Sequence, residues 1–398
     1  MNIFVINSGS SSIKYQLFNM PDPNPICSGL VERIGLEDSI ITHKIFTGAE
    51  PQVIRETIQL KDHEQGLNEV TKLLTDSNYG VIKDPSEIEA VGHRVVHGGE
   101  AFASTTIIND EVEQKILDLF SLAPLHNPAN YKGIKVAEKI FSRAKQVAVF
   151  DTAFHQTMPE RAFRFAIPKA YYTQHKIRAY GFHGTSHKYV SREAGRFLQS
   201  PSAKMITIHL GNGCSMTAIE NGRSVDHSMG FGPLGGLIMG TRSGDIDPSI
   251  IFHLIEHMGM SAKEVSSLLN KQSGMLGLTG FSDMRDIMKQ ISEGDRDAML
   301  AYELYAYRIK KYIGSFAAVL NGVDALVFTA GVGENDAEVR RRSCTQMEYL
   351  GIQLDEKSNA ERVPGIRDIS VPGSRVRILI VPTNEELEIA NECYDLLT

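Results

Sequence analysis

The chain has 398 residues, of which 42% are hydrophobic and 22% charged. At roughly 150 residues per domain, this length predicts two or three domains, and we start from two. The composition excludes a disordered, collagenous or coiled-coil protein. Because the formal net charge is −7, no positive field attracts nucleic acid or an anionic membrane, and we expect neither as a partner.

Closely spaced strands open the chain. Apolar runs rich in Ile, Val and Phe predict strands at residues 2–7, 12–18, 26–34, 40–46 and 52–60. The next segments predict a helix at 63–76, a strand at 88–96, helices at 110–122 and 129–142, and a strand at 146–150. This alternation of strands and helices is typical of an α/β fold.

The remainder of the chain alternates in the same way. Its pattern predicts a helix at 184–198, strands at 204–210 and 215–220, several helices between 249 and 321, strands at 324–329 and 375–381, and helices at 336–347 and 384–396. No Pro-rich or Ser-rich linker divides the chain, so the domain boundary is expected to be a tight crossover. We place it near Phe150.

Two distant stretches share one pattern, which is a weak internal repeat. Residues 3–18 (IFVINSGSSSIKYQLF) and 205–220 (MITIHLGNGCSMTAIE) each read as a strand, a glycine-containing polar turn and a strand. Such turns let backbone N–H groups and hydroxyls approach a polyphosphate, with Lys14 as an added charge at the first turn. Two chance hairpins with solvent-facing turns would give the same pattern, so both interpretations stay open.

A third glycine-rich element follows the strand predicted at 324–329. The sequence GVGEN at 331–335 leads into a helix predicted near Asp336, and a helix N-terminus beside glycines suits a nucleotide. No GxxxxGK[ST] motif occurs, which excludes a Walker-type ATPase. GFGPLG at 230–235 matches GxGxxG, but residues 225–229 before it read as a poor buried strand and Pro233 interrupts the expected helix, so we treat this match as false.

Cationic side chains stand between small residues at two places. Arg94 in GHRVVHGG and Arg242 in GTRSGD can each hold a carboxylate or a transferring phosphoryl group, although a surface ion pair is the ordinary alternative. His183, at a predicted helix start, is expected to stabilise a phosphoryl group. His183 and His187 also have the i, i+4 spacing of zinc ligands, with Asp151 and His155 as further candidates, but no HExxH motif is present.

Acidic residues follow two predicted strands. Asp151 ends the strand at 146–150, and Glu385 and Glu386 open the last helix, where negative charge is favoured in any case. Either acid could help to hold hydrated Mg²⁺. The four cysteines form no CxxC pair, the N-terminus lacks the order of a signal peptide, and no apolar run approaches roughly 18 residues, so we expect a cytoplasmic protein.

A series of motifs resembles the acetate and propionate kinase family. In chain order they are IFVINSGSSSIK, GHRVVHGG, DTAFHQTMP, YGFHGTSH, HLGNGCS, GTRSGDIDP, GVGEN and PTNEE. The resemblance covers nearly the whole chain and implies the duplicated ribonuclease-H-like, actin-like α/β fold with two domains and an interdomain cleft. It implies an N-terminal acetate-kinase-type domain of residues 1–150 plus 386–398, a nucleotide-binding domain of residues 151–385, and a homodimer.

The same resemblance implies reversible in-line transfer of the γ-phosphoryl group of ATP to acetate, giving acetyl phosphate and ADP. The implied cofactor is Mg²⁺, for which Mn²⁺ could substitute. A propionate kinase acting on longer short-chain carboxylates is the alternative. Val96 would favour acetate, because a smaller residue there would admit a longer chain, although one methylene is worth only roughly 1–3 kcal/mol.

The family roles fall on these residues of the chain. The implied catalytic residues are Asp151, Arg94, His183 and Arg242. The implied acetate-binding residues are Arg94, Val96, Leu125, Phe182 and Pro233. The implied ATP-binding residues are Lys14, His209, Leu210, Gly211, Asn212, Gly213, Asp283, Met284, Arg285, Gly331, Val332, Gly333, Glu334 and Asn335, and the implied metal-proximal residues are Asn7 and Glu385.

Three other classes of protein compete with this interpretation. An actin-like or chaperone-like ATPase would not need GHRVVHGG or GTRSGDIDP, a sugar kinase would use Asp151 as a base for a neutral hydroxyl, and a hydrolase would use zinc. Acetate has a carboxyl pKa of about 4, so it is already ionised at neutral pH and needs no base to remove a proton. We therefore expect Asp151 to orient metal-bound water or an arginine rather than to move a proton.

Overall fold

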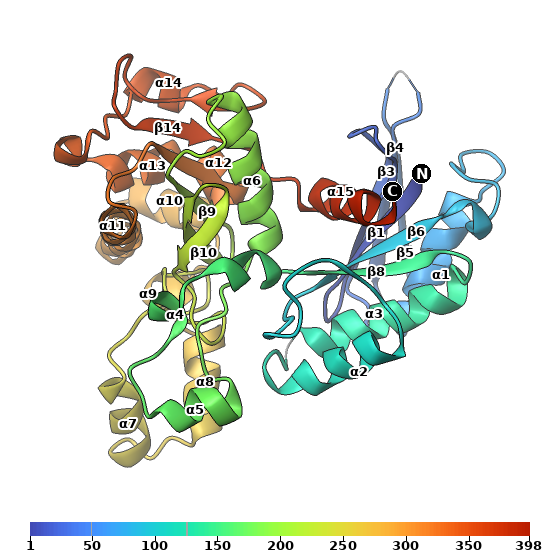
Figure 1. Ribbon diagram of the computed structural model, residues 1–398, viewed down its shortest axis with the longest axis horizontal. Helices are drawn as coiled ribbons and strands as arrows, with labels where there is room; N and C mark the ends of the chain where they lie inside the picture. Colours follow the sequence, from blue (N-terminus) through green and yellow to red (C-terminus); the bar gives the residue numbers. More distant parts are fainter. Residues whose placement is uncertain (49, 125) are drawn as a thin grey trace. The chain divides into compact units, whose positions relative to one another are not determined.

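The computed structural model describes residues 1–48, 50–124 and 126–398. They divide into two compact units: unit 1 contains Met1–Phe154 and Asn384–Thr398, and unit 2 contains His155–Thr383. Each unit is built on its own mixed sheet with helices beside it (Figure 1). Among the described residues, no helix has the length and apolar character needed to cross a membrane.

The sheet of unit 1 has the strand order β5-β4-β3-β2-β1-β6-β8-β7. Its strands are β1 (Asn2–Ser8), β2 (Ile13–Asn19), β3 (Pro25–Glu32), β4 (Ser39–Ile45), β5 (Gln52–Ile58), β6 (Ala90–Val95), β7 (Thr106–Ile107) and β8 (Lys145–Phe150). β1 to β5 form an antiparallel series, whereas β1, β6 and β8 are parallel neighbours. The predicted strands of this half are confirmed.

The helices of unit 1 cover this sheet with apolar faces. They are α1 (His63–Leu74), α2 (Asp110–Asp118), α3 (Asn127–Ile140) and α15 (Glu385–Leu397), with short 3₁₀ turns η1 (Pro85–Glu87), η2 (Leu119–Ser121) and, at the border of the unit, η3 (Ala153–Thr157). α1 begins where the Asp62 side chain accepts a hydrogen bond from the Gln65 N–H, and it buries Leu67 and Val70 in the core.

The sheet of unit 2 has the strand order β11-β10-β9-β12-β14-β13. Its strands are β9 (Met205–Leu210), β10 (Cys214–Glu220), β11 (Arg223–His227), β12 (Ala325–Thr329), β13 (Arg367–Asp368) and β14 (Arg377–Ile380). β9 pairs antiparallel with β10 on one side and parallel with β12 on the other, as β1 does with β2 and β6 in unit 1. The repeat of residues 3–18 and 205–220 is therefore structural, because each stretch is the central hairpin of its sheet.

The helices of unit 2 lie before, between and after these strands. They are α4 (Glu160–Phe163), α5 (Lys169–His175), α6 (Gly184–Phe197), α7 (Ser249–Glu256), α8 (Ala262–Lys271), α9 (Gly274–Thr279), α10 (Met284–Ser292), α11 (Arg296–Val319), α12 (Ala330–Asn335), α13 (Ala337–Cys344), η4 (Glu348–Leu350) and α14 (Glu356–Ala360). α11 packs against α13 and against the strand face at β9 and β10, which places it behind the second hairpin.

The last helix returns to the first sheet. α15 follows β14 of unit 2 in the sequence but packs on β1 and β6 of unit 1. The approach is close at Gly92 of β6, where an ideal Cβ would lie 2.7 Å from Ile389 Cγ2 and 2.8 Å from Cys393 Sγ. A side chain at position 92 would push α15 off the sheet, which explains the glycine there.

Residues 225–229 read as a poor buried strand, and Arg223–His227 forms the edge strand β11, in which only Ser224 and His227 are buried. One prediction of local structure is wrong. Residues 331–335 were expected to be a turn, but Ala330–Asn335 forms the short helix α12. The GFGPLG match is indeed false, since no helix begins among the described residues between β11 and α7.

Candidate active site

Arg94 lies at the carboxyl edge of the parallel strands of unit 1. Because β1, β6 and β8 are neighbours in register, their ends bring Asn7, Arg94 and the region of Asp151 to one place. Arg94 donates to both Asp151 carboxylate oxygens, from Nε at 3.2 Å and from Nη2 at 2.5 Å. Arg94 Nη1 also donates to Asn7 Oδ1 at 3.4 Å. The fork of the guanidinium is thus fixed from two sides.

Carboxylates dominate the electrostatics around Arg94. Burial lowers the pKa of its guanidinium, but the charges of Asp151 and Glu385 outweigh burial and hold that pKa above its usual value. Glu385, the first residue of α15, lies 3.8 Å from Arg94 Nε. Burial raises the pKa of the Glu385 carboxyl, and the charge of Asp151 adds to this while Arg94 opposes it. An added cation would favour the charged form of Glu385.

The first hairpin turn places Lys14 beside an acid. Lys14 Nζ forms a 2.7 Å ion pair with Glu386, while its side chain stays half exposed. Within the turn, the Gly9 N–H donates to the Ser12 carbonyl, and the Gly9 carbonyl lies 2.7 Å from His63 Nε2. The turn is therefore an ordered loop, with its predicted phosphate-binding lysine engaged by α15.

The loop after β6 is held by amide side chains that sequence reasoning missed. The N–H of Val96 donates to Asn130 Oδ1 at 3.1 Å, and the N–H of His97 donates to Asn127 Oδ1 at 3.1 Å. Asn130 also donates to the Ser8 carbonyl, so one side chain ties the first hairpin to the loop of Val96. Val96 is buried. Leu125, the other apolar residue predicted for this pocket from unit 1, lies outside the described residues.

His183 and Arg242 converge beside the second hairpin in unit 2. An ideal Cβ at Gly213 would lie 3.4 Å from His183 Nε2 and 3.8 Å from Arg242 Nη1, so the glycine leaves room for both. His183 immediately precedes α6 with φ 56°, a left-handed conformation that few side chains adopt. Its Nδ1 lies 2.9 Å from Ser215 Oγ. This arrangement holds the Nε2 edge of the imidazole near the guanidinium.

Arg242 differs from Arg94 in its surroundings. Its Nη1 donates to the Pro233 carbonyl at 3.1 Å, and burial lowers the pKa of the guanidinium. The predicted acyl-pocket residue Pro233 thus positions Arg242 through its backbone. Phe182, also predicted for that pocket, is buried directly before His183, and its carbonyl lies 3.0 Å from His155 Nε2 and 2.9 Å from His227 Nε2.

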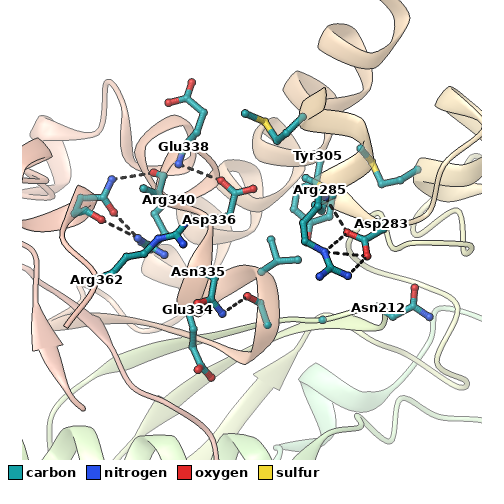
Figure 2. A pocket seen from close by; sticks show the side chains of 18 of the residues that line it. Asn212, Asp283, Arg285, Tyr305, Glu334, Asn335, Asp336, Glu338, Arg340 and Arg362 are labelled. Atoms are coloured by element: carbon teal, nitrogen blue, oxygen red, sulfur yellow. Dashed lines mark hydrogen bonds and ion pairs between the residues drawn. The ribbon is translucent and has the colours of Figure 1, made fainter. Parts of the chain in front are cut away.

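A cavity of about 1100 Å³ opens in unit 2, and Figure 2 shows its lining. It is large enough for a nucleotide. The predicted ATP-binding residues that line it are Gly211, Asn212, Asp283, Met284, Arg285, Gly331, Val332, Glu334 and Asn335. Asp283 accepts from the Arg285 N–H at the start of α10 and pairs with its guanidinium, which lowers the pKa of Asp283 to about 2.

Other predicted ATP-binding residues of unit 2 do not line the cavity. His209 stacks on His183 with ring centroids 4.4 Å apart and bonds Ser186 through Nδ1. Leu210 is fully buried in the sheet, and Gly213 lies at the His183 side of the turn. The Gly333 carbonyl accepts a hydrogen bond from Arg340.

Comparison with known proteins decides the family. Residues 2–391 match the model of the acetokinase family. The chain belongs to this family. It is 57% identical to the acetate kinase of Flavobacterium johnsoniae over 397 residues, which span 100% of both chains.

Solved structures agree with the acetokinase assignment. A crystal structure of Porphyromonas gingivalis acetate kinase matches with a TM-score of 0.93 and 45% identity, covering 100% of both chains. A propionate kinase from Francisella tularensis matches with a TM-score of 0.91 and 41% identity, covering 98% of both. The two-sheet α/β fold is therefore that of the acetokinases, as the motif series implied.

The acetokinase cavity has a side that sequence reasoning missed. Its lining continues over Asp336, Glu338, Arg340, Asn359, Glu361, Arg362 and Arg367. Arg340 is almost fully buried and donates to the Gly333 carbonyl and to both oxygens of Asn359, so it fastens α12 to α14. Burial lowers its pKa to about 10, with the charge of Arg367 adding to the effect. An internal arginine in the run VRRR carries no signal that separates it from its half-buried neighbours Arg341 and Arg342.

The zinc alternative finds no support in this acetokinase. Within the described part of the chain, no group of three or more His, Cys, Asp or Glu side chains is arranged to hold a metal ion. His187 points into a hydroxyl network instead, with Nδ1 2.7 Å from Thr207 Oγ1 and Nε2 2.7 Å from Ser215 Oγ. The i, i+4 spacing of His183 and His187 is therefore a spacing of hydrogen-bonding groups.

Proposed function

We propose that the chain is an acetate kinase, which transfers the γ-phosphoryl group of ATP to acetate and releases acetyl phosphate and ADP. The full-length similarity to proteins named acetate kinase supports this. The observation that carries the mechanism is the convergence of His183 and Arg242 at Gly213, in the hairpin whose Gly211 and Asn212 line a nucleotide-sized cavity. We assign the nucleotide to the cavity of unit 2 and the carboxylate of acetate to Arg94 of unit 1.

The chemistry requires charge cancellation rather than a base. Acetate is ionised at neutral pH, so its oxygen can attack without losing a proton. The attacking and accepting groups are both anionic, and a loose transition state spreads charge over the equatorial oxygens of the phosphoryl group. We assign Arg94 to the acetate carboxylate, and Arg242 and His183 to the equatorial oxygens.

Asp151 acts on Arg94 in this proposal. Its two carboxylate oxygens accept hydrogen bonds from Nε and Nη2 of the guanidinium. The remaining nitrogen, Nη1, donates toward Asn7 and is the one that can reach other acceptors. A carboxylate held in this way serves to orient the arginine. This supports the expectation that Asp151 does not move a proton.

Mg²⁺ is the proposed cofactor, with Mn²⁺ as a substitute. Asn7 and Glu385 would supply the oxygen ligands that such hard cations prefer, and Mg²⁺ commonly uses only one or two protein ligands together with substrate phosphates. The raised pKa of Glu385 reflects burial among acids, which a nearby cation would relieve. When bound, the ion would neutralise charge on the β- and γ-phosphate oxygens.

Dimerisation and location belong to the same proposal. In α7 of unit 2 no residue is buried, although Ile250, Phe252 and Ile255 are apolar and exposed. We propose that this apolar α7 face joins two copies of the chain in a homodimer. The four cysteines are buried and form no disulfides, which fits a reducing, cytoplasmic setting.

A hydroxylamine trap for acyl phosphate tests the reaction. The protein is incubated with ATP, Mg²⁺ and a panel of acetate, propionate, glucose and glycerol, and hydroxamate and ADP are measured separately. Acetate-dependent hydroxamate with equimolar ADP is expected. ADP release without a carboxylate would indicate an ATPase, and release that depends on glucose or glycerol would indicate a sugar kinase. A larger kcat/KM for propionate than for acetate would favour the propionate kinase alternative.

A further inference from the structure

Unit 2 buries a group of imidazoles behind His183. His155, His187 and His227 are buried, with the rings of His155 and His227 4.2 Å apart and those of His187 and His227 5.4 Å apart. Hydrogen bonds divide them into two branches. His155 bonds Ser224 Oγ at 2.9 Å, whereas His187 bonds Ser215 Oγ, the same oxygen that bonds His183.

Ser215 is the junction of a linear chain of groups. His183 Nδ1 lies 2.9 Å from Ser215 Oγ, His187 Nε2 lies 2.7 Å from the same oxygen, and His187 Nδ1 lies 2.7 Å from Thr207 Oγ1. A serine hydroxyl has one proton to donate. Ser215 therefore cannot donate to both imidazoles, and at least one of them donates to Ser215 Oγ, so the tautomers of His183 and His187 constrain each other.

We propose that Ser215 and His187 are positioning residues that hold His183 in its Nε2–H tautomer. In this arrangement Thr207 donates to His187 Nδ1, His187 Nε2–H donates to Ser215, and Ser215 donates to His183 Nδ1. The proton of His183 then sits on Nε2, at the edge that lies near Gly213 and Arg242. The inference rests on the function proposed above, in which that edge donates to a phosphoryl oxygen.

Charge around the chain favours a neutral His187. Burial lowers the pKa of His187 well below its usual value, and the nearby imidazoles of His227, His155, His209 and His183 add to the shift. The guanidinium of Arg242 is a further positive charge near the His183 end. A neutral His187 has one N–H only, so its direction of donation is set by Thr207 and Ser215.

The tautomers can be read directly by nitrogen-correlated NMR of the imidazoles in the full-length protein without substrates. We expect His183 and His187 to carry their protons on Nε2 at pH 7.5. A His183 proton on Nδ1 would overturn the proposal. This measurement on the unaltered protein decides the question even if a variant fails to fold.

Variants add a kinetic test. Ser215→Ala should give a mixture of His183 tautomers and lower kcat by about tenfold or more, a loss typical of removing a group that orients a histidine, with the KM for ATP changed less than twofold. Ser215→Thr keeps the hydroxyl and should restore the Nε2–H tautomer. Ser224→Ala is the matched control, because it removes a buried hydroxyl from His155 on the other branch. An unchanged His183 tautomer in Ser215→Ala would overturn the inference.

The two proposals fail in distinguishable ways. If His183 carries its proton on Nε2 but the protein forms no acetyl hydroxamate, the proposed function is wrong and the coupling of tautomers stands. If the protein is an active acetate kinase with the His183 proton on Nδ1, the coupling is wrong and the function stands.

Discussion

The two arginines assigned to the reaction have opposite electrostatic environments. Arg94 is paired with Asp151 and lies near Glu385, and its pKa is raised. Arg242 has the Pro233 carbonyl and Met239 Sδ as its hydrogen-bond partners, and burial lowers its pKa. The charge of Arg242 is thus less compensated by protein carboxylates, which leaves the guanidinium available to the negative charge of a transferring phosphoryl group.

Arg242→Ala should lower kcat by about 10²-fold or more, because the lost contact acts on charge that develops in the transition state. The KM for ATP should stay similar. Steady-state kinetics of hydroxamate formation measure both quantities. Arg223→Ala, at the exposed start of β11, is the control and should behave like the unaltered protein. An effect mainly on KM would contradict the assignment to the transition state.

Val96 is the residue on which acetate selectivity depends in our proposal. Val96→Ala should lower the KM for propionate more than the KM for acetate, since the shorter side chain makes room for one methylene, worth roughly 1–3 kcal/mol. Competition between the two acids reports the ratio of kcat/KM values. Val95→Ala removes the same volume from a buried core position one residue earlier and should leave the ratio unchanged. If Val96→Ala changes the KM for acetate and the KM for propionate equally, Val96 does not determine the selectivity for acetate.

At the scale of the element, strands rich in apolar residues were predictable and short polar edge strands were not. The central strands β1, β9 and β12 are rich in apolar residues, because both faces are covered, and the sequence locates each of them. β7, β11 and β13 lie at or near sheet edges, are two to five residues long and carry polar side chains. Their pairing comes from neighbouring strands, which local sequence does not encode.

The same distinction applies to the site. Motifs flanked by glycine predicted Arg94, His183 and Arg242 as site residues without any structure, and His183 and Arg242 do lie together at Gly213. Arg340, Asn130 and Ser215 were missed because their roles depend on partners distant in sequence: Asn359 for Arg340, Ser8 for Asn130, and His187 for Ser215. Single-sequence reasoning finds groups that stand in unusual local settings, but not common residues that become important through packing.

α7 provides a prediction at this scale. Phe252→Glu places a charge in the apolar α7 face, where Phe252 is 59% exposed, and should convert the proposed dimer to a monomer. Light scattering coupled to size-exclusion chromatography measures the mass. Leu36→Glu, which alters a leucine of unit 1 that is 52% exposed, should leave the mass unchanged. A dimer that persists in Phe252→Glu would place the interface elsewhere.

For the molecule as a whole, buried histidines predict the pH dependence of stability. Burial lowers the pKa values of His43, His93, His97 and His227 to about 4. In the unfolded chain each histidine has a pKa of about 6.5. Between pH about 4 and pH about 6.5 the unfolded chain therefore binds more protons than the folded one. Stability should therefore be full above pH about 6.5 and fall by up to about 1.4 kcal/mol per pH unit for each histidine as the pH drops toward 4.

His43→Asn isolates one of these contributions. His43 Nδ1 lies 2.7 Å from the Tyr15 hydroxyl, and its Nε2 is buried without a hydrogen-bond partner among the described residues. Asparagine can keep the bond to Tyr15 but does not titrate. The slope of unfolding free energy against pH from 7 to 5, from urea denaturation, should be shallower in His43→Asn. His175→Asn, on exposed α5, should keep the slope of the unaltered protein. Identical slopes in His43→Asn and the unaltered protein would contradict the prediction.

The return of α15 to the first sheet bears on how the chain acquires its structure during translation. β1, β2, β6 and β8 leave the ribosome early, yet the helix that shields part of their apolar surface is synthesised last. Gly92 offers no side chain of its own to fill the space that Ile389 and Cys393 later occupy. The nascent residues of unit 1 must therefore persist with part of the apolar surface of their sheet exposed to solvent. During this time more than two hundred further residues, 155–383, are synthesised. Clipping the chain ahead of residue 384 would make that transient exposure permanent and favour aggregation.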